Sequence, residues 1–213
     1  MLGYSDPGFS VLSVRYRLSE LPALLRTPIG RKQLRHGLLI RTTPFHVLAA
    51  RLYRRFRLKN VKTVTVVGSF GKTTTTRCLF AMLGMPENPR LQGNRGISLA
   101  RNIRRIKPSD RFAVLETGIS GPGQMQESAD MARPDIVVVT CIGSEHNRSF
   151  KTLEATRQEK SVMVSALDDR TGLAVLNGDD PNVLWMAKRT GARCLTFGLG
   201  PKNDVRAENI RLD

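Results

Sequence analysis

A glycine-flanked turn followed by a lysine and four threonines gives residues 63–76, TVTVVGSFGKTTTT, a pattern suited to phosphate chemistry. The β-branched run before the turn predicts a strand, and the residues from Lys72 onward predict a helix. Unpaired backbone N–H groups at the start of a helix attract phosphate, as does the helix dipole. We therefore expect the backbone of this turn, here called the phosphate loop, to cradle phosphate groups. Its residues are Gly68, Ser69, Phe70 and Gly71.

Lys72 and the next two threonines add side-chain chemistry to the phosphate loop. Lys72 would place a positive charge near phosphate oxygens, and the hydroxyl of Thr73 or Thr74 would be an oxygen ligand for Mg²⁺. The standard loop of NTPases has a glycine five positions before Gly71, where this chain has Val66. The pattern is therefore a shortened one, GxxGKT, and it predicts binding of a nucleoside triphosphate with magnesium.

From residue 62 onward, short apolar runs alternate with stretches of helical periodicity. This alternation is typical of a mostly parallel sheet with helices on both faces. The predicted strands are residues 63–67, 112–116, 136–141, 173–176 and 194–197. The predicted helices are residues 72–83, 122–131, 153–167 and 181–190, and the helices at 122 and 181 open with proline. The predicted fold class is α/β, similar to P-loop NTPases, preceded by a basic helical segment.

Polar residues and glycines occur where the predicted strands end. They are Gly68, Glu116, residues 143–146, Asn177 and Gly198. Ligands of open parallel sheets bind at the carboxyl ends of the strands, so we expect these groups to converge on one crevice. Glu116 ends a buried strand beside the phosphate loop, where a carboxylate would suit Mg²⁺, a cation that prefers oxygen ligands.

The N-terminal segment carries most of the positive charge. Residues 1–62 contain 13 Lys and Arg against two acidic residues, so +11 of the net charge of +16 lies there. Thr43 followed by Pro44 predicts a helix start. An apolar stripe at helical spacing then follows, made of Phe45, Leu48, Leu52 and Phe56. A basic amphipathic helix of this kind usually packs its stripe on the neighbouring domain, but it can also lie on anionic lipid or bind an acidic partner.

Several classes of protein do not fit the composition. The three cysteines, Cys78, Cys141 and Cys194, lack CxxC spacing, which argues against a zinc site or a disulfide framework. No stretch approaches the roughly 20 apolar residues of a membrane span, and no signal-peptide pattern opens the chain. We therefore expect a cytoplasmic protein, peripheral at the inner membrane face if its basic segment meets lipid. Because the charge is concentrated in one segment, nucleic acid is not an expected partner.

A set of linked motifs resembles the central ATP-binding domain of the Mur ligase family over about residues 60–200. The motifs are GSFGKTTTT, ETGISG, RPDIVVVTCIGSEHNRSF, ATRQEK and AVLNGDDP followed by TFG. Within the family they are most similar to the type that adds D-alanyl-D-alanine to a muramoyl tripeptide. The resemblance divides the chain into a basic, partly helical segment, residues 1–60, and an ATP-binding domain, residues 61–213.

The resemblance also implies roles for individual residues. The phosphate loop and Lys72 would hold the phosphates of ATP, and Thr73 or Thr74 with Glu116 would hold a first magnesium ion. Asn177, in LNGDDP, matches the stretch near the adenine.

Two further residues gain a role only through the resemblance, because a loop histidine is usually solvated and a helix lysine is usually exposed. His146 would serve a second magnesium ion. Lys160 matches the family lysine that is carbamylated, which would turn a cation into a carboxylate-like group near the metal. With Lys72, these two residues are the expected catalytic residues.

The activity that the resemblance implies is ATP-dependent amide formation. Mur ligases make an acyl phosphate from a carboxylate and ATP, and an amine of an amino acid or peptide then attacks it. Magnesium and Lys72 would neutralise charge on the transferred phosphoryl group. The pathway would be cell-wall or acidic-polymer biosynthesis.

The chain departs from the family pattern at both ends. The first 60 residues have no counterpart of the domain that holds the UDP-sugar substrate, and an anionic polymer or a lipid-linked precursor would suit the Arg-rich segment as well. No C-terminal ligase domain follows the ATP-binding domain, so we expect either a fragment or a partner chain that supplies it. Two alternatives stay open: a P-loop NTPase switch or motor of another family, and a non-catalytic module that binds nucleotides or anions.

Overall fold

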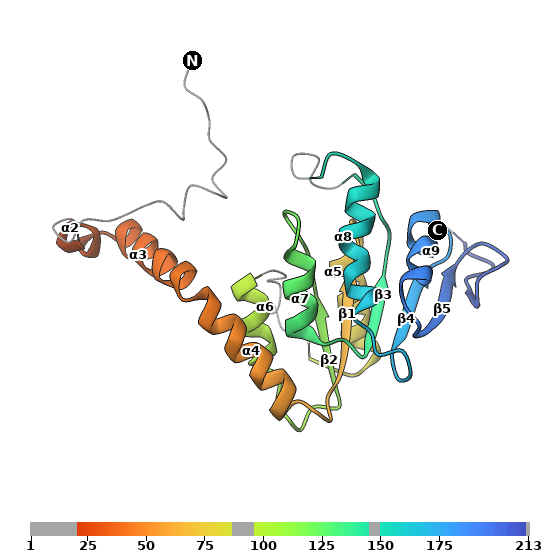
Figure 1. Ribbon diagram of the computed structural model, residues 1–213, viewed down its shortest axis with the longest axis horizontal. Coiled ribbons are helices and arrows are strands. Elements are labelled where there is room, and N and C mark those ends of the chain that lie inside the picture. Colours follow the sequence, from red (N-terminus) through yellow and green to blue (C-terminus); the bar gives the residue numbers. More distant parts are fainter. Residues whose placement is uncertain (1–20, 87–95, 145–149, 212–213) are drawn as a thin grey trace, which may run out of the picture.

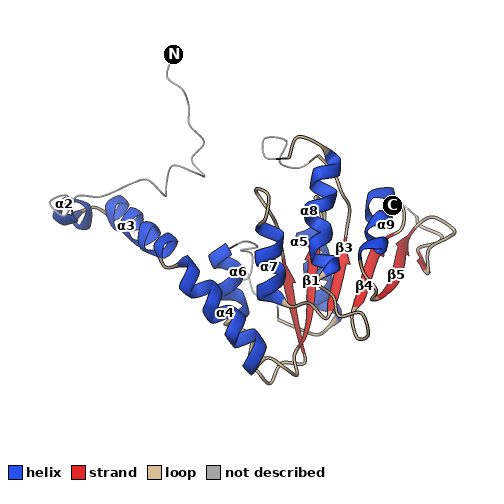
Figure 2. Ribbon diagram, viewed as in Figure 1, coloured by secondary structure: helices blue, strands red, loops and turns tan. Residues whose placement is uncertain are grey.

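A computed structural model of the protein describes residues 21–86, 96–144 and 150–211. The fold is built on a parallel sheet. Within these residues the strand order is β2-β1-β3-β4-β5-β6, and every neighbouring pair runs parallel (Figures 1 and 2). The strands are β1 (Lys62–Val67), β2 (Phe112–Glu116), β3 (Ile136–Val139), β4 (Leu173–Asn177), β5 (Arg193–Gly198) and β6 (Val205–Arg206). The predicted α/β class with a parallel sheet is confirmed.

Three consecutive helices cover one face of the sheet (Figure 1). They are α7 (Gln124–Ala132), α8 (Leu153–Ser165) and α9 (Pro181–Met186), and a short 3-10 helix, Ala187–Arg189, follows α9. Alternate strand residues point to them: Val137 and Val139 pack in one cluster with Met163 of α8, whereas Val138 belongs to the cluster on the other face. Strands β1, β2 and β3 are buried on both faces, as parallel strands normally are.

Helix α5 (Lys72–Met82) lies on the opposite face and follows directly on the phosphate loop. Its Phe80 packs with Val66 and Val114, which orients the helix so that its first turn lies at the carboxyl end of β1. Helix α6 (Gly96–Ile103) packs beside β2 on the face of α7. Lys72 and the following threonines are therefore placed at the strand ends where ligands of such sheets bind.

Three N-terminal helices form an arm, residues 21–57, that extends away from the sheet (Figure 1). They are α2 (Leu21–Arg26), α3 (Pro28–Arg41) and α4 (Thr43–Arg57). Helix α4 packs against α6 and α7 through the buried Val47 and Ala50, whereas the apolar stripe is exposed. The expectation that this stripe packs on the neighbouring domain was wrong, because the smaller side chains on the opposite side of α4 make that contact. None of the described helices is long and apolar enough to cross a bilayer.

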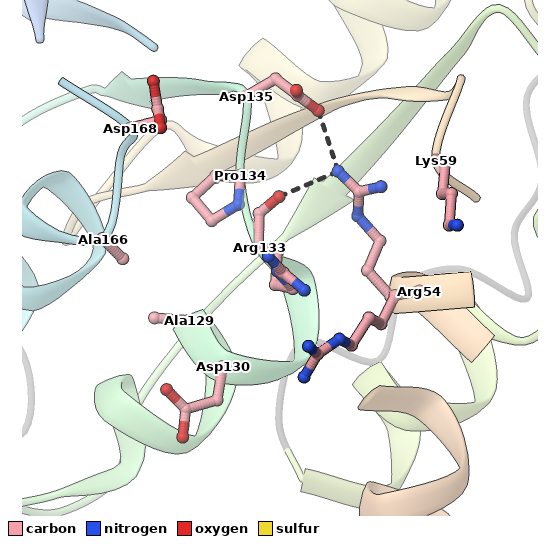
Figure 3. A pocket seen from close by; sticks show the side chains of 10 residues that line it. Arg54, Lys59, Ala129, Asp130, Arg133, Pro134, Asp135, Ala166 and Asp168 are labelled. Carbon is pink, nitrogen blue, oxygen red and sulfur yellow. Dashed lines mark hydrogen bonds and ion pairs between the residues drawn. The ribbon is translucent and has the colours of Figure 1, made fainter. Parts of the chain in front are cut away.

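Arg54 of α4 joins the arm to the amino end of the sheet (Figure 3). Its Nε donates to the carbonyl of Ala132 (2.9 Å) and its Nη1 to that of Leu58 (2.6 Å). Its Nη2 donates to the carbonyl of Arg133 (3.0 Å) and to Oδ2 of Asp135 (2.9 Å). Burial lowers the pKa of Arg54 and the charge of Asp135 opposes that shift. A cavity of about 420 Å³ lies beside these groups, at the amino ends of the strands, whereas the phosphate loop lies at their carboxyl ends.

Replacing Arg54 with alanine should lower the free energy of unfolding by about 2 kcal/mol, because a buried network of hydrogen bonds is lost. Asp135 would keep two partners, the backbone N–H of Thr63 (2.8 Å) and Nζ of Lys62 (3.5 Å), so the loss stays below that for an isolated buried charge. Urea denaturation measures the change. Arg51→Ala is the matched control, since the Arg51–Asp130 pair is about 40% exposed and should contribute under about 1 kcal/mol. Equal losses in the two variants would contradict the role given to Arg54.

Helices α2, α3 and α6 are not among the predicted helices, and several boundaries differ. Helix α7 begins at Gln124 rather than residue 122, because Gly123, at φ 78°, is its N-cap. Helix α8 ends at Ser165 rather than residue 167, where the last turn tightens and Leu167 N–H donates to the carbonyl of Val164. Strand β3 ends at Val139 rather than residue 141, since the next carbonyls accept hydrogen bonds from the phosphate loop and from β4.

The remaining differences concern α9, β6 and the start of α4. Helix α9 ends at Met186, and the 3-10 helix stops before Thr190. The short strand β6, which follows β5, is not among the predicted strands. Thr43 does not cap α4: the residue before the helix is Thr42, whose hydroxyl donates to the carbonyl of Leu38 in the preceding helix instead.

Candidate functional site

The phosphate loop has a backbone conformation that only glycine adopts easily at two of its positions. Gly68 has φ 149°, and Gly71, the N-cap of α5, has φ 79°. A Cβ atom on Gly68 would lie 1.9 Å from Oγ1 of Thr140, so no side chain fits there. The loop therefore passes close to the residues that follow β3. It leads into the first turn of α5, whose unpaired N–H groups form an anion site.

Ser69 holds the middle of the loop against the end of β3. Its N–H donates to the carbonyl of Cys141 (2.7 Å). Its Oγ donates to the carbonyl of Gly143 (3.0 Å) and accepts from the N–H of the same residue (2.8 Å). Because Ser69 is only 2% exposed, these bonds position the loop rather than a ligand.

Two lysines reach the phosphate loop from opposite faces of the sheet. Lys72 of α5 donates from Nζ to the carbonyl of Ser69 (2.7 Å). Lys160 of α8 donates from Nζ to the carbonyl of Gly68 (2.7 Å) and to Oγ of Ser69 (3.0 Å), and it is 1% exposed. The sequence reasoning that a lone helix lysine is usually exposed does not apply to Lys160. Both predicted lysines therefore meet at one loop, and the site gathers positive charge where phosphate would bind.

Thr73 and Glu116 form the oxygen-rich side of the site. The hydroxyl of Thr73 donates to Oε2 of Glu116 (2.9 Å), which ends β2 and is 8% exposed. Thr73 and the alternative threonine, Thr74, are both exposed to solvent, and the contact with the carboxylate is what favours Thr73. A carboxylate and a hydroxyl are the ligand types that Mg²⁺ prefers, and this ion completes its shell with water and phosphate oxygens. The donor set of Thr73 and Glu116 thus fits magnesium.

Asn177, at the end of β4, connects to the phosphate loop through Thr140. Its Nδ2 donates to the carbonyl of Thr140 (2.8 Å), and Oγ1 of Thr140 donates to the carbonyl of Phe70 (2.6 Å). The Oδ1 of Asn177 accepts from the N–H of Asp179 (3.0 Å). Hydrogen bonds from the N–H groups of residues 199 and 200 lower the pKa of the Asp179 carboxyl, because they stabilise its ionised form.

The structure brings together the predicted groups at the ends of β1, β2 and β4. His146 lies outside the described residues. Sequence reasoning missed Thr140, which contacts the loop, and the role of Asp180, whose Oδ2 accepts from the N–H of Ile142 (2.7 Å) while Oδ1 caps α9. The Asp-Pro pair at the start of α9 signalled the cap, but the bond to Ile142 depends on a contact across 38 residues.

Comparison with known proteins identifies the family of the chain. The family model described as Mur ligase middle domain matches residues 66–213. A UDP-N-acetylmuramoyl-tripeptide–D-alanyl-D-alanine ligase of Bacillus subtilis is 28% identical over 152 residues, which are 70% of this chain and 32% of that protein. The corresponding ligase of Borreliella burgdorferi is 34% identical over 106 residues, 48% of this chain and 23% of that one.

Solved structures with the same fold include MurF proteins. MurF from Acinetobacter baumannii has a TM-score of 0.72 at 21% identity, over 80% of this chain and 38% of that one. The MurF ligase of Thermotoga maritima, solved in complex with ADP, has a TM-score of 0.64 at 27% identity, over 76% of this chain and 38% of that one. The chain thus spans about a third of the length of the relatives it matches. Because the middle-domain model matches more than half of it, the chain belongs to the Mur ligase family.

Proposed function

We propose that this chain is the ATP-binding part of a ligase that joins a carboxylate to the amine of an amino acid or peptide through an acyl phosphate. The observation that supports it best is the arrangement around the phosphate loop, where Lys72, the Thr73–Glu116 pair and Lys160 meet at the carboxyl ends of the strands. Phosphoryl transfer depends mainly on positioning and on neutralising charge, and this is what such a set of groups can do.

Magnesium is the metal that we propose for this site, with Thr73 and Glu116 as its protein ligands. When bound, the ion would polarise the phosphate oxygens and offset their charge. The first turn of α5 would hold the phosphates through its N–H groups, and Lys72 would turn from the carbonyl of Ser69 to a phosphate oxygen. His146 stays a proposed ligand of a second magnesium ion, and Asn177 a proposed neighbour of the adenine.

The substrates that we propose follow the names of the relatives, which add D-alanyl-D-alanine to a UDP-N-acetylmuramoyl tripeptide. The muramoyl tripeptide would supply the carboxylate and the dipeptide the amine. The assay is ADP release by the complete ligase of which we propose this chain is a part, with ATP, magnesium and each substrate, alone and together. Release that requires both substrates supports the ligase, whereas release that requires neither would indicate an NTPase of another kind.

Lys160 is proposed to react with carbon dioxide to give a carbamate. The ammonium group first loses a proton to become an amine, and a second proton leaves as the N–C bond forms and one C=O double bond of carbon dioxide opens to a carboxylate. A cation beside the phosphate loop thereby becomes an anion. Lys160→Ala should then abolish ADP release, and a short carboxylate such as acetate should restore part of it by replacing the lost anionic group. Lys160→Ala with normal activity, or with a defect that acetate leaves unchanged while the fold is intact by circular dichroism, would contradict the carbamate.

A further inference from the structure

The apolar stripe of α4 is exposed along the whole helix. Phe45 is 73% exposed, Leu48 55%, Leu52 47% and Phe56 58%. Residues three or four positions apart lie on one side of an α-helix, so these four side chains form a continuous apolar surface. A monomeric protein rarely leaves two phenylalanines and two leucines side by side in water, and such a surface usually marks an interaction site.

Contacts on the other side of α4 keep the stripe turned outward. Val47 and Ala50 are buried against α6 and α7, and Arg54 makes the buried network described above. The hydroxyl of Tyr53 donates to the carbonyl of Ile106 (2.8 Å), and Arg51 pairs with Asp130 (2.8 Å). Rotating α4 to bury the stripe would break all of these contacts. The described residues of the domain therefore do not cover the stripe.

Exposed apolar side chains continue along the rest of the arm. Leu25 is 55% exposed, Ile29 71% and Leu38 63%. Helices α2 and α3 project beyond the sheet, so the arm presents these side chains at a distance from the domain (Figure 1). The arm thus exposes apolar side chains on α2 and α3 in addition to the continuous stripe of α4.

The charge of the arm indicates which kind of partner covers it. Residues 21–57 contain nine Lys and Arg and no Asp or Glu. Arg51 and Arg54 contact the domain, and the other seven side chains are exposed: Arg26, Arg31, Lys32, Arg35, Arg41, Arg55 and Arg57. Two copies of such an arm repel each other, which argues against self-association. A purely ionic polymer would leave the phenylalanines and leucines in water.

We propose that the arm is a docking surface for an anionic lipid bilayer. The stripe would enter the boundary between headgroups and acyl chains, and the arginines beside it would contact lipid phosphates, as in other interfacial amphipathic helices. Arg41 and Arg55 carry long apolar stems that let the guanidinium reach the headgroups while the stem covers the stripe. The proposal rests on the arm alone and does not require the ligase activity.

Vesicle flotation with the whole chain tests the proposal. Vesicles with about one-third phosphatidylglycerol should bind the protein at least tenfold more strongly than pure phosphatidylcholine vesicles, since each Lys or Arg near the surface adds about fivefold. The double variant F45S/F56S should lose at least tenfold of that binding, and so should R55E/R57E. All four positions are exposed, so the substitutions should leave the fold unchanged, as measured by circular dichroism.

Matched variants elsewhere on the surface separate the arm from general stickiness and charge. M82S/L199S removes two apolar side chains that are 82% and 62% exposed, and R170E/K202E reverses two exposed charges. Both should bind vesicles like the unchanged protein. Equal loss in the control and arm variants would overturn the proposal, as would absence of binding to the anionic vesicles.

Two other occupants give distinct results. The protein could bind soluble polyglutamate as strongly as vesicles, with no effect of F45S/F56S. That result would indicate an acidic polymer instead. A dimer in analytical ultracentrifugation that dissociates on F45S/F56S, without vesicle binding, would indicate a second copy of the chain. Either result would overturn the lipid proposal.

Discussion

Replacing Gly68 with alanine should destabilise the fold by about 4 kcal/mol, the sum of a strained backbone and an overpacked contact. The residue has φ 149°, which L-amino acids rarely adopt, and its new methyl group would lie 1.9 Å from Oγ1 of Thr140. The neighbouring strand end cannot retreat, because Thr140 is itself bonded to the loop at Phe70 and to Asn177. Urea denaturation of the variant measures the loss.

Two companion variants separate strain from crowding. Gly84 has φ 64°, and an added methyl group there would have no atom within 4 Å, so alanine at this position should cost only about 1 kcal/mol, from strain alone. Adding Thr140→Ala to Gly68→Ala removes the crowded hydroxyl and should recover part of the stability. If Gly68→Ala is tolerated as well as Gly84→Ala, the close approach of the loop to β3 is wrong.

Replacing Lys72 with alanine should weaken ATP binding about 100-fold, because a charge-assisted hydrogen bond to phosphate contributes about 1.5–3 kcal/mol. The same change removes a donor to the carbonyl of Ser69, so a loss of about 1 kcal/mol in stability accompanies it. Isothermal titration calorimetry with ATP and magnesium measures the affinity.

Lys202→Ala is the control for Lys72→Ala, since it removes the same charge from an exposed position in the turn between β5 and β6. Its affinity for ATP should match that of the unchanged protein. Equal affinities in all three proteins would show that ATP does not bind at the phosphate loop, and the non-catalytic alternatives would then account for the chain better.

Most of the sheet could be predicted because its strands are short apolar runs, and the burial of β1, β2 and β3 on both faces leaves a clear local pattern. The convergence of Gly68, Glu116 and Asn177 could be predicted as well, since parallel strands place their carboxyl ends together. The partners of Lys160 could not. They depend on how α8 packs over β1, across 92 residues of sequence, and local periodicity carries no such information.

The arm shows a different limit of sequence reasoning. The largest apolar residues of α4 suggested the buried side, but the domain packs on Val47 and Ala50. Small side chains let two helices approach closely, and the buried guanidinium of Arg54 then adds hydrogen bonds that no hydrophobic pattern signals. A helix with apolar residues on two sides therefore gives an ambiguous pattern, which only the tertiary contacts resolve.

The hydrogen bonds from Asn177 to Thr140 and from Thr140 to Phe70 link the end of β4 with the phosphate loop. Groups that share a network do not contribute independently to stability. In a double-mutant cycle, Asn177→Ala and Thr140→Ala should together cost less than the sum of their separate effects. A nucleotide with its base near Asn177 and its phosphates on the loop would then bind two regions that are already coupled thermodynamically in the free protein. Its base and its phosphates would therefore not contribute additively to affinity.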